Sequence, residues 1–257
     1  MLRVSNLSVE YADGTRAIED LSFSIEAGES VALIGANGAG KTTLLLAIVG
    51  VLPPIAGEIS LHSSAAGPDE QKNAPAQAAR GAVKPELVLT QRTGKDTLRE
   101  LRARVGVVFQ NPDDQLFMPG IYEDVAFGPR SFGIEEAETV QRVDAALSSL
   151  GIAHLADRSP LKLSGGEKRL AAIATVLAMK PDLLLFDEPT AYLDPRAKRN
   201  LAQIVSGLPQ GKLIATHDMA FAAETCSRVL LIREGSVMED GPRDILFNAR
   251  KLEAAGL

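Results

Sequence analysis

The segment at residues 35–42, GANGAGKT, constrains the fold of this chain more than any other feature. It fits the pattern G-x-x-x-x-G-K-[ST], in which main-chain N–H groups of a glycine-rich turn surround phosphate oxygens. The apolar run SVALI precedes it and TTLLLAIVG follows it, so we predict a strand, the turn, and a helix over about 41–52. The N-terminus of that helix favours the binding of an anion, because its free N–H groups and the helix dipole present positive charge. We therefore expect Lys41 to reach the β- and γ-phosphates of a nucleotide, and the Thr42 hydroxyl to ligate Mg²⁺.

Predicted strands alternate with predicted helices along the rest of the chain. Strands are expected within residues 2–34 and at VGVVFQ, LLLFDE, LIATHD and RVLLIREG, while residues 134–180 carry the i, i+3, i+4 apolar pattern of helices. This order implies an α/β fold with a mainly parallel sheet that is covered on both faces. GEISLH and PELVLTQR are typical of two hairpin strands. Between them, residues 63–84 lack any apolar period, which predicts a flexible insertion, either inert or with a regulatory role.

Composition and charge narrow the class of protein. The chain has 257 residues, of which 46% are hydrophobic and 23% charged, and we treat residues 1–257 as a single domain. The formal net charge of −6 does not favour nucleic acid as a partner. The single cysteine, Cys226, excludes an internal disulfide and is interpreted as a buried apolar residue. The longest apolar run, residues 44–52, is far shorter than the ~20 residues of a membrane span. Because no signal peptide is visible, we expect a protein that reaches a membrane from the cytoplasmic face, through partners.

Two adjacent acids end the apolar strand LLLFDE. Asp187 is placed to hold Mg²⁺ through water, and Glu188 is placed to polarise a water that attacks the nucleotide. Such a pair at a strand end is often merely solvated. In a chain that also carries a phosphate-binding loop, it predicts hydrolysis.

The segment LSGGEKR, residues 163–169, offers a second place for an anion. A serine, two glycines and a following helical run present a hydroxyl and free N–H groups, and they also form an ordinary helix cap. A chain with one complete phosphate loop has no second nucleotide of its own for this site.

With these motifs in order, the chain resembles the ATPases of ABC transporters. The resemblance covers about residues 3–240 and implies a P-loop NTPase with a RecA-like parallel-sheet core, a β-rich lobe and a helical lobe at about 111–175. In that family the signature of one subunit closes over the ATP held by the other, so the resemblance implies a dimer that binds ATP and Mg²⁺ and hydrolyses ATP.

The resemblance assigns further residues one at a time. Tyr11 in VEYADG matches the aromatic side chain that stacks on adenine, and Gln110 in VVFQ matches the glutamine that contacts Mg²⁺ and the water. Asp194 in AYLDP matches the aspartate that crosses the dimer, and His217 in ATHD matches the histidine that contacts the γ-phosphate. Tyr192 departs from the small residue that is more usual at its position. The expected nucleotide-binding residues are Tyr11, Gly35, Asn37, Gly38, Gly40, Lys41, Thr42, Thr43, Ser164, Gly165 and Gly166. The expected catalytic residues are Glu188, His217, Lys41 and Gln110, and the expected metal ligands are Thr42, Gln110 and Asp187.

A subtype follows from FQNPDDQLF, residues 109–117, and the EDVAFGP that comes soon after. These segments resemble the ATPases of energy-coupling-factor importers, and SGGEKRLAAIATVLAM is most similar to the cobalt/nickel branch. The implied partners are a second ATPase subunit, identical or not, a transmembrane coupling subunit and a substrate-specific membrane subunit. We expect Asp113, Asp114, Gln115 and Phe117 at the rim of the groove for the coupling subunit, although Phe117 would also suit the core of the helical lobe. The remaining alternatives are a vitamin importer, a non-transport ABC protein and a module that binds ATP without hydrolysing it.

Overall fold

A six-stranded sheet forms the centre of the computed structural model, which describes residues 1–62 and 86–257. The strand order is β10-β9-β3-β8-β7-β6, and all neighbours pair in parallel except β10, which pairs antiparallel with β9 at one edge. The strands are β3 (Ser30–Ile34), β6 (Val105–Val108), β7 (Leu183–Asp187), β8 (Gly211–Ala215), β9 (Arg228–Arg233) and β10 (Ser236–Pro242). The predicted parallel sheet is confirmed. The insertion predicted at 63–84 lies outside the described residues.

Both faces of this sheet are covered, which explains why its central strands are apolar without alternation. In β3, Val31 and Leu33 pack into one core, whereas Ala32 and Ile34 pack into the other. All four are fully buried. A strand with two buried faces favours apolar residues at successive positions, so hydrophobic periodicity alone would not distinguish it from a short buried helix.

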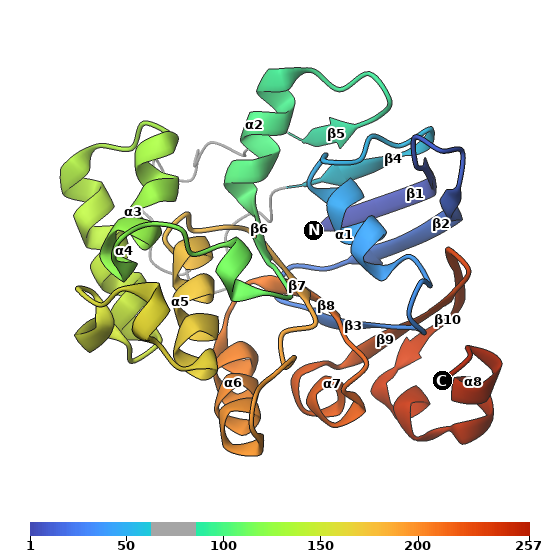
Figure 1. The fold of residues 1–257 in the computed structure, drawn as a ribbon. Coiled ribbons are helices and arrows are strands. Elements are labelled where there is room, and N and C mark those ends of the chain that lie inside the picture. The colour runs from blue at the N-terminus through green and yellow to red at the C-terminus, as the bar shows by residue number, and fades with distance from the viewer. Residues whose placement is uncertain (63–85) are drawn as a thin grey trace, which may run out of the picture.

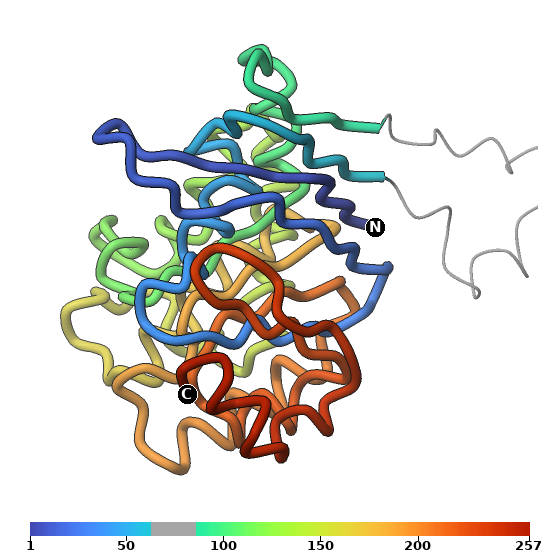
Figure 2. Tube along the Cα trace, turned by 90° about the vertical axis from the view of Figure 1, so that its right-hand side faces the viewer, coloured from blue at the N-terminus to red at the C-terminus, as the bar shows by residue number. Residues whose placement is uncertain are grey.

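A second, four-stranded antiparallel sheet covers one face. Its order is β2-β1-β4-β5, formed by β1 (Leu2–Glu10), β2 (Arg16–Ile25), β4 (Ala56–Leu61) and β5 (Leu87–Leu89). The predicted hairpin partners do pair as β4 and β5. Helix α1 (Lys41–Ile48) lies between the two sheets and shares a core with both (Figure 1). The N-terminus therefore lies in the four-stranded layer, whereas the C-terminus lies beyond the six-stranded sheet (Figure 2).

The helix after the phosphate loop is shorter than predicted. We expected it to run to about residue 52, but α1 ends at Ile48. Gly50 adopts a positive φ of 65° and its N–H donates to the carbonyl of Ala47, so the chain turns out of the helix there. The apolar residues beyond this point are part of a loop before Pro53.

Helices cover the other face of the six-stranded sheet. Helices α3, α4 and α5 gather beyond the β6 edge, and α6 and α7 lie below the sheet (Figure 1). Their bounds are α3 (Ile121–Ser131), α4 (Glu136–Ser149), α5 (Gly165–Leu177), α6 (Pro195–Gly207) and α7 (Met219–Thr225). We did not predict α6 or α7 from the sequence, nor α2 (Lys95–Arg104) and the C-terminal η4 (Arg243–Phe247) and α8 (Ala249–Ala254). Among the described residues, no helix is both long and apolar enough to cross a membrane.

Candidate functional site

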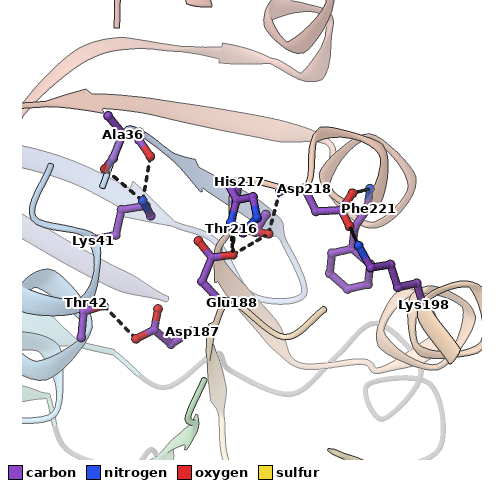
Figure 3. Close-up of polar contacts among 11 residues, drawn as sticks. Ala36, Lys41, Thr42, Asp187, Glu188, Lys198, Thr216, His217, Asp218 and Phe221 are labelled. Atoms are coloured by element: carbon purple, nitrogen blue, oxygen red, sulfur yellow. Dashed lines mark hydrogen bonds and ion pairs between the residues drawn. The ribbon is translucent and has the colours of Figure 1, made fainter. Parts of the chain in front are cut away.

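The glycine-rich loop joins β3 to α1 with a backbone that only glycine accepts freely. Gly40, the residue before α1, has φ 100°, and a Cβ there would lie 2.7 Å from the carbonyl oxygen of Ala17. Lys41 opens the helix with its side chain buried beneath the loop. Its Nζ donates to the carbonyl of Gly35 at 2.7 Å and of Ala36 at 3.1 Å (Figure 3). Burial lowers the pKa of Lys41, and the nearby carboxylates of Asp187 and Glu188 partly oppose this shift.

Thr42 and Asp187 meet across the loop, although they are 145 positions apart in the sequence. The Thr42 hydroxyl donates to Oδ2 of Asp187 at 2.8 Å (Figure 3). Burial raises the pKa of Asp187, while the bond from Thr42 counteracts that rise. The described residues contain no cluster of three or more His, Cys, Asp or Glu suited to a metal. A hydroxyl and one carboxylate nevertheless fit Mg²⁺, because that ion usually takes its remaining oxygens from phosphates and water.

Glu188 follows directly and is held by three contacts from the end of β8. Its Oε2 accepts from the Thr216 hydroxyl at 3.2 Å and from the main-chain N–H of His217 at 3.2 Å, and it lies 2.8 Å from Nδ1 of His217 (Figure 3). Its backbone has a φ of 42°, a region that non-glycine residues adopt rarely. Side chain and main chain are therefore both fixed. Thr216 was not predicted, and its position between the apolar LIA and His217 was the only signal for it.

These residues share one cleft of about 670 Å³. The predicted residues that line it are Tyr11, Asn37, Gly38, Gly40, Lys41, Thr42, Thr43, Gln110, Asp187, Glu188 and His217. Lining residues that we did not predict are Thr15, Arg16, Ala17 and Glu234. Gly35 lies just beneath the loop, where a Cβ would come within 2.5 Å of the Ile232 carbonyl oxygen. The hydroxyl of the half-exposed Tyr11 forms a hydrogen bond of 2.6 Å with Oγ1 of Thr43.

Gln110 is positioned by a buried cation that the sequence reasoning missed. The guanidinium of Arg169, in α5, donates to the carbonyl oxygens of Phe109 at 2.5 Å and Gln110 at 2.6 Å. Arg169 is 1% exposed, and burial lowers its pKa to about 10. The arginine thus ties the signature helix to the loop that carries Gln110. Its position inside the segment GEKRLAAIA gave no sign of burial.

The signature residues do not line the cleft of the glycine loop. Ser164 and Gly166 line a separate hollow of about 660 Å³, together with Asp194. Ser164 caps α5: its hydroxyl donates to Oε2 of Glu167 at 2.7 Å and accepts from the Glu167 N–H. Within one chain, Ser164, Gly165 and Gly166 are therefore apart from the other predicted nucleotide ligands.

Of the residues that we expected at the rim of a groove for a coupling subunit, Gln115 departs from that expectation. Gln115 does not face outward, because its Nε2 donates to the Ala172 carbonyl at 2.8 Å and to Oγ1 of Thr175 at 2.7 Å. Asp113 is exposed and forms an ion pair with Lys168 at 2.5 Å. Phe117 is 61% exposed, so the alternative of a core residue is wrong for it. Its ring packs edge-on against the half-exposed Phe127 at a centroid distance of 5.0 Å.

Comparisons with known proteins agree with this geometry. Residues 18–191 match the family described as ABC transporter. A Geobacter sulfurreducens protein, provisionally named an ABC transporter ATP-binding protein, is 43% identical, and the alignment covers 100% of this chain and 93% of the relative. An energy-coupling factor transporter ATP-binding protein EcfA from Methanothermobacter thermautotrophicus is 37% identical over 100% of this chain and 76% of the relative.

Solved structures lead to the same family. The structure of cbiO1 from Clostridium perfringens, part of the ABC transporter complex cbiONQ, is 33% identical with a TM-score of 0.77, and covers 97% of this chain and 91% of that one. One cleft contains a phosphate loop, an adjacent pair of acids and a histidine, and the family match covers more than half of the chain. We conclude that this chain belongs to the ABC transporter family and is an ATP-binding subunit that hydrolyses ATP.

Proposed function

We propose that this chain energises an energy-coupling-factor type importer whose cargo is a transition-metal ion, cobalt or nickel. The observation that carries the proposal is the likeness to cbiO1 over 97% of the chain, since that protein is described as part of a cbiONQ complex. Two relatives named EcfA, each aligned over 100% of this chain, support the importer type. The proposed partners are a transmembrane coupling subunit, a cargo-binding membrane subunit and a second ATPase subunit.

The proposed reaction is attack of water on the γ-phosphorus of ATP. Glu188 accepts the proton of the attacking water, the bond from the γ-phosphorus to the bridging oxygen breaks, and ADP and phosphate leave. Lys41 and His217 stabilise the charge that develops on the γ-phosphate oxygens. The contacts from Thr216 and the His217 N–H hold the Glu188 carboxylate in place for this role.

The metal site in this proposal consists of Thr42 and Asp187, with Gln110 beside them in the same cleft. Thr42 and Asp187 would hold Mg²⁺, which would supply positive charge to neutralise part of the charge of the phosphates. Tyr11 also lines the cleft and would stack on the adenine.

A second copy, or a closely related subunit, completes the site in our proposal. Ser164 and its glycines present a hydroxyl and a helix N-terminus from a hollow that is separate from the glycine loop. An ABC cassette of the same fold is described as a dimer bound to ADP and Pi. We propose that Ser164 of one subunit contacts the γ-phosphate held by the other, so that ATP draws the subunits together and hydrolysis releases them.

Dimerisation is tested with Glu188→Gln, which keeps the shape of the side chain but replaces the base. We expect this variant to bind Mg-ATP, to lose turnover, and to accumulate as a dimer measured by light scattering. Wild-type protein with ADP is the control. Turnover at the wild-type rate would exclude Glu188 as the base, and a monomer at saturating Mg-ATP would exclude the homodimer.

Cargo is tested by uptake. The chain is expressed with its co-purifying membrane proteins in cells that lack their own importers, and radioactive cobalt, nickel and vitamins are supplied separately. Uptake of a metal ion that is lost with Lys41→Ala supports the proposal. Uptake of a vitamin alone, dependent on the same lysine, would replace the metal importer with a vitamin importer. Membrane proteins that transport neither cargo would refute the importer type.

A further inference from the structure

Helix α3 contains a buried acid that the proposed reaction does not use. Asp124 is 3% exposed, and its helix neighbours Ile121, Val125 and Ala126 are fully buried in the apolar core. Its Oδ2 is also buried and has no hydrogen-bond partner within residues 1–62 and 86–257. Burial raises the pKa of Asp124, while hydrogen bonds from two main-chain N–H groups partly oppose that rise. An acid in such surroundings costs folding free energy that an apolar residue would not cost, so stability alone does not account for it.

The two N–H groups belong to the loop that carries Phe117. Oδ1 of Asp124 accepts from the main-chain N–H of Phe117 at 2.9 Å and from that of Met118 at 2.9 Å. Residues 115–120 contain no helix or strand, so regular secondary structure does not hold this stretch of backbone. One carboxylate oxygen therefore holds the backbone of the loop at the residue whose ring is exposed.

The ring of Phe117 is held by the same helix. Phe127 stands at i+3 from Asp124, on the same side of α3, and the two phenylalanine rings pack edge-on at a centroid distance of 5.0 Å. On the other side of Phe117, Nε2 of Gln115 donates to the carbonyl of Ala172 in α5 at 2.8 Å. Phe117 thus has an exposed side chain on a backbone that is anchored to two helices.

We propose that Asp124 is a positioning residue for coupling, whose carboxylate holds residues 117 and 118 so that the Phe117 ring is presented to the transmembrane coupling subunit. The inference rests on the proposed function, which supplies that subunit. The surface is continuous with the catalytic cleft, because the chain that leads to Phe117 starts from Gln110, which lines the cleft. A side chain that is ordered before association loses less conformational entropy on binding, so holding Phe117 in place raises the affinity for the partner.

The first measurement needs only the isolated chain. Amide hydrogen exchange, followed residue by residue by NMR, reports whether the N–H groups of Phe117 and Met118 are held. Asp124→Leu removes the acceptor and keeps the branching of the side chain, whereas Asp124→Asn keeps an acceptor oxygen. We expect both amides to exchange at least about tenfold faster in Asp124→Leu, and within about threefold of the wild-type rate in Asp124→Asn. Val125→Ala is the matched control, because it removes core contacts from the same helix and leaves the acceptor in place.

The second measurement is a double-mutant cycle with Phe117→Ala. Affinity is measured in detergent for the transmembrane subunit that co-purifies with the wild-type chain. Asp124→Leu should weaken binding at least about fivefold when the Phe117 ring is present, and change it less than about twofold in the Phe117→Ala background. Asp124→Asn and Val125→Ala should bind like the wild type. A carboxylate that served only the stability of the helical lobe would weaken binding equally in both backgrounds.

The outcomes separate this proposal from the proposed function. If Asp124→Leu does not fold, Asp124→Ala takes its place in both measurements. Unchanged exchange at Phe117 and Met118, or equal losses of affinity with and without the Phe117 ring, would overturn the role of Asp124 and leave the proposed function intact. A wild-type chain that binds no transmembrane subunit would overturn the proposed function and the coupling role together.

Discussion

Replacing Phe117 by alanine tests whether this residue anchors the coupling subunit. Phe117 is 61% exposed, so about two fifths of its surface is buried, and its ring packs against Phe127. A fully buried phenylalanine removes about 150–250 Å² from water, so this ring removes roughly 60–100 Å². At about 25 cal/mol per Å², the loss of stability would be at most ~1.5–2.5 kcal/mol, and less once the compact unfolded chain is considered. Truncation of a core phenylalanine would cost about 3–5 kcal/mol.

The measurement pairs stability with partner binding. Urea unfolding of the isolated subunit should show a loss of about 1–2 kcal/mol, and its basal ATPase rate should remain close to that of the wild type. Pull-down with the transmembrane coupling subunit should weaken by at least about tenfold, because a central exposed aromatic residue dominates interface energies. Phe247→Ala serves as the control, since that ring is also exposed but lies at the C-terminal end of the chain.

Two results would refute this reasoning. A loss of 3–5 kcal/mol with normal partner binding would mean that Phe117 serves the helical lobe and not the partner. Normal stability with normal binding and uptake would mean that the exposed pair of rings has no role in coupling.

Three further predictions concern the cleft. Lys41→Ala should abolish most nucleotide binding, measured by titration with a fluorescent ATP analogue, and an unchanged affinity would contradict the phosphate-loop assignment. Thr216→Val removes one hydrogen bond from Glu188 without changing shape, so we expect the turnover number to fall severalfold while ATP affinity is unchanged; a fall in affinity alone would count against this role. Arg169→Met removes both donors to the Gln110 loop, so we expect a higher Mg²⁺ concentration for half-maximal ATPase, with partial rescue by Arg169→Lys. An unchanged Mg²⁺ dependence would exclude Arg169 as a positioning residue.

The sequence alone determined the local chemistry of the site. The glycines, the lysine and the threonine of the phosphate loop lie close together in the chain. When a strand precedes them and a helix follows them, their spacing alone predicts a loop that binds phosphate. The apolar sequence LLLFDE likewise predicted a buried strand with the two acids at its end. Cys226 was expected to be buried, and it is 3% exposed.

Other features required the assembled chain. Thr42 and Asp187 are 145 positions apart, and only the pairing of β7 with β8, and of β8 with β3, brings their loops together. The inward turn of Gln115 and the burial of Arg169 depend on how α5 packs against the preceding loop, which no local pattern encodes. The end of α1 at Ile48 was likewise not predictable from the local pattern, because the apolar run continues to residue 52 although Gly50 turns the chain.

The division between the two sources of information has a physical reason. Short-range spacing determines the geometry of a loop or a helix cap, because a few bonds limit where the atoms can lie. Side-chain exposure, in contrast, is a property of everything that packs nearby. Tyr192 illustrates this: the letters AYLDP indicate only an unusual residue, whereas the tertiary structure reveals a strained backbone and a ring that almost nothing in its own chain covers.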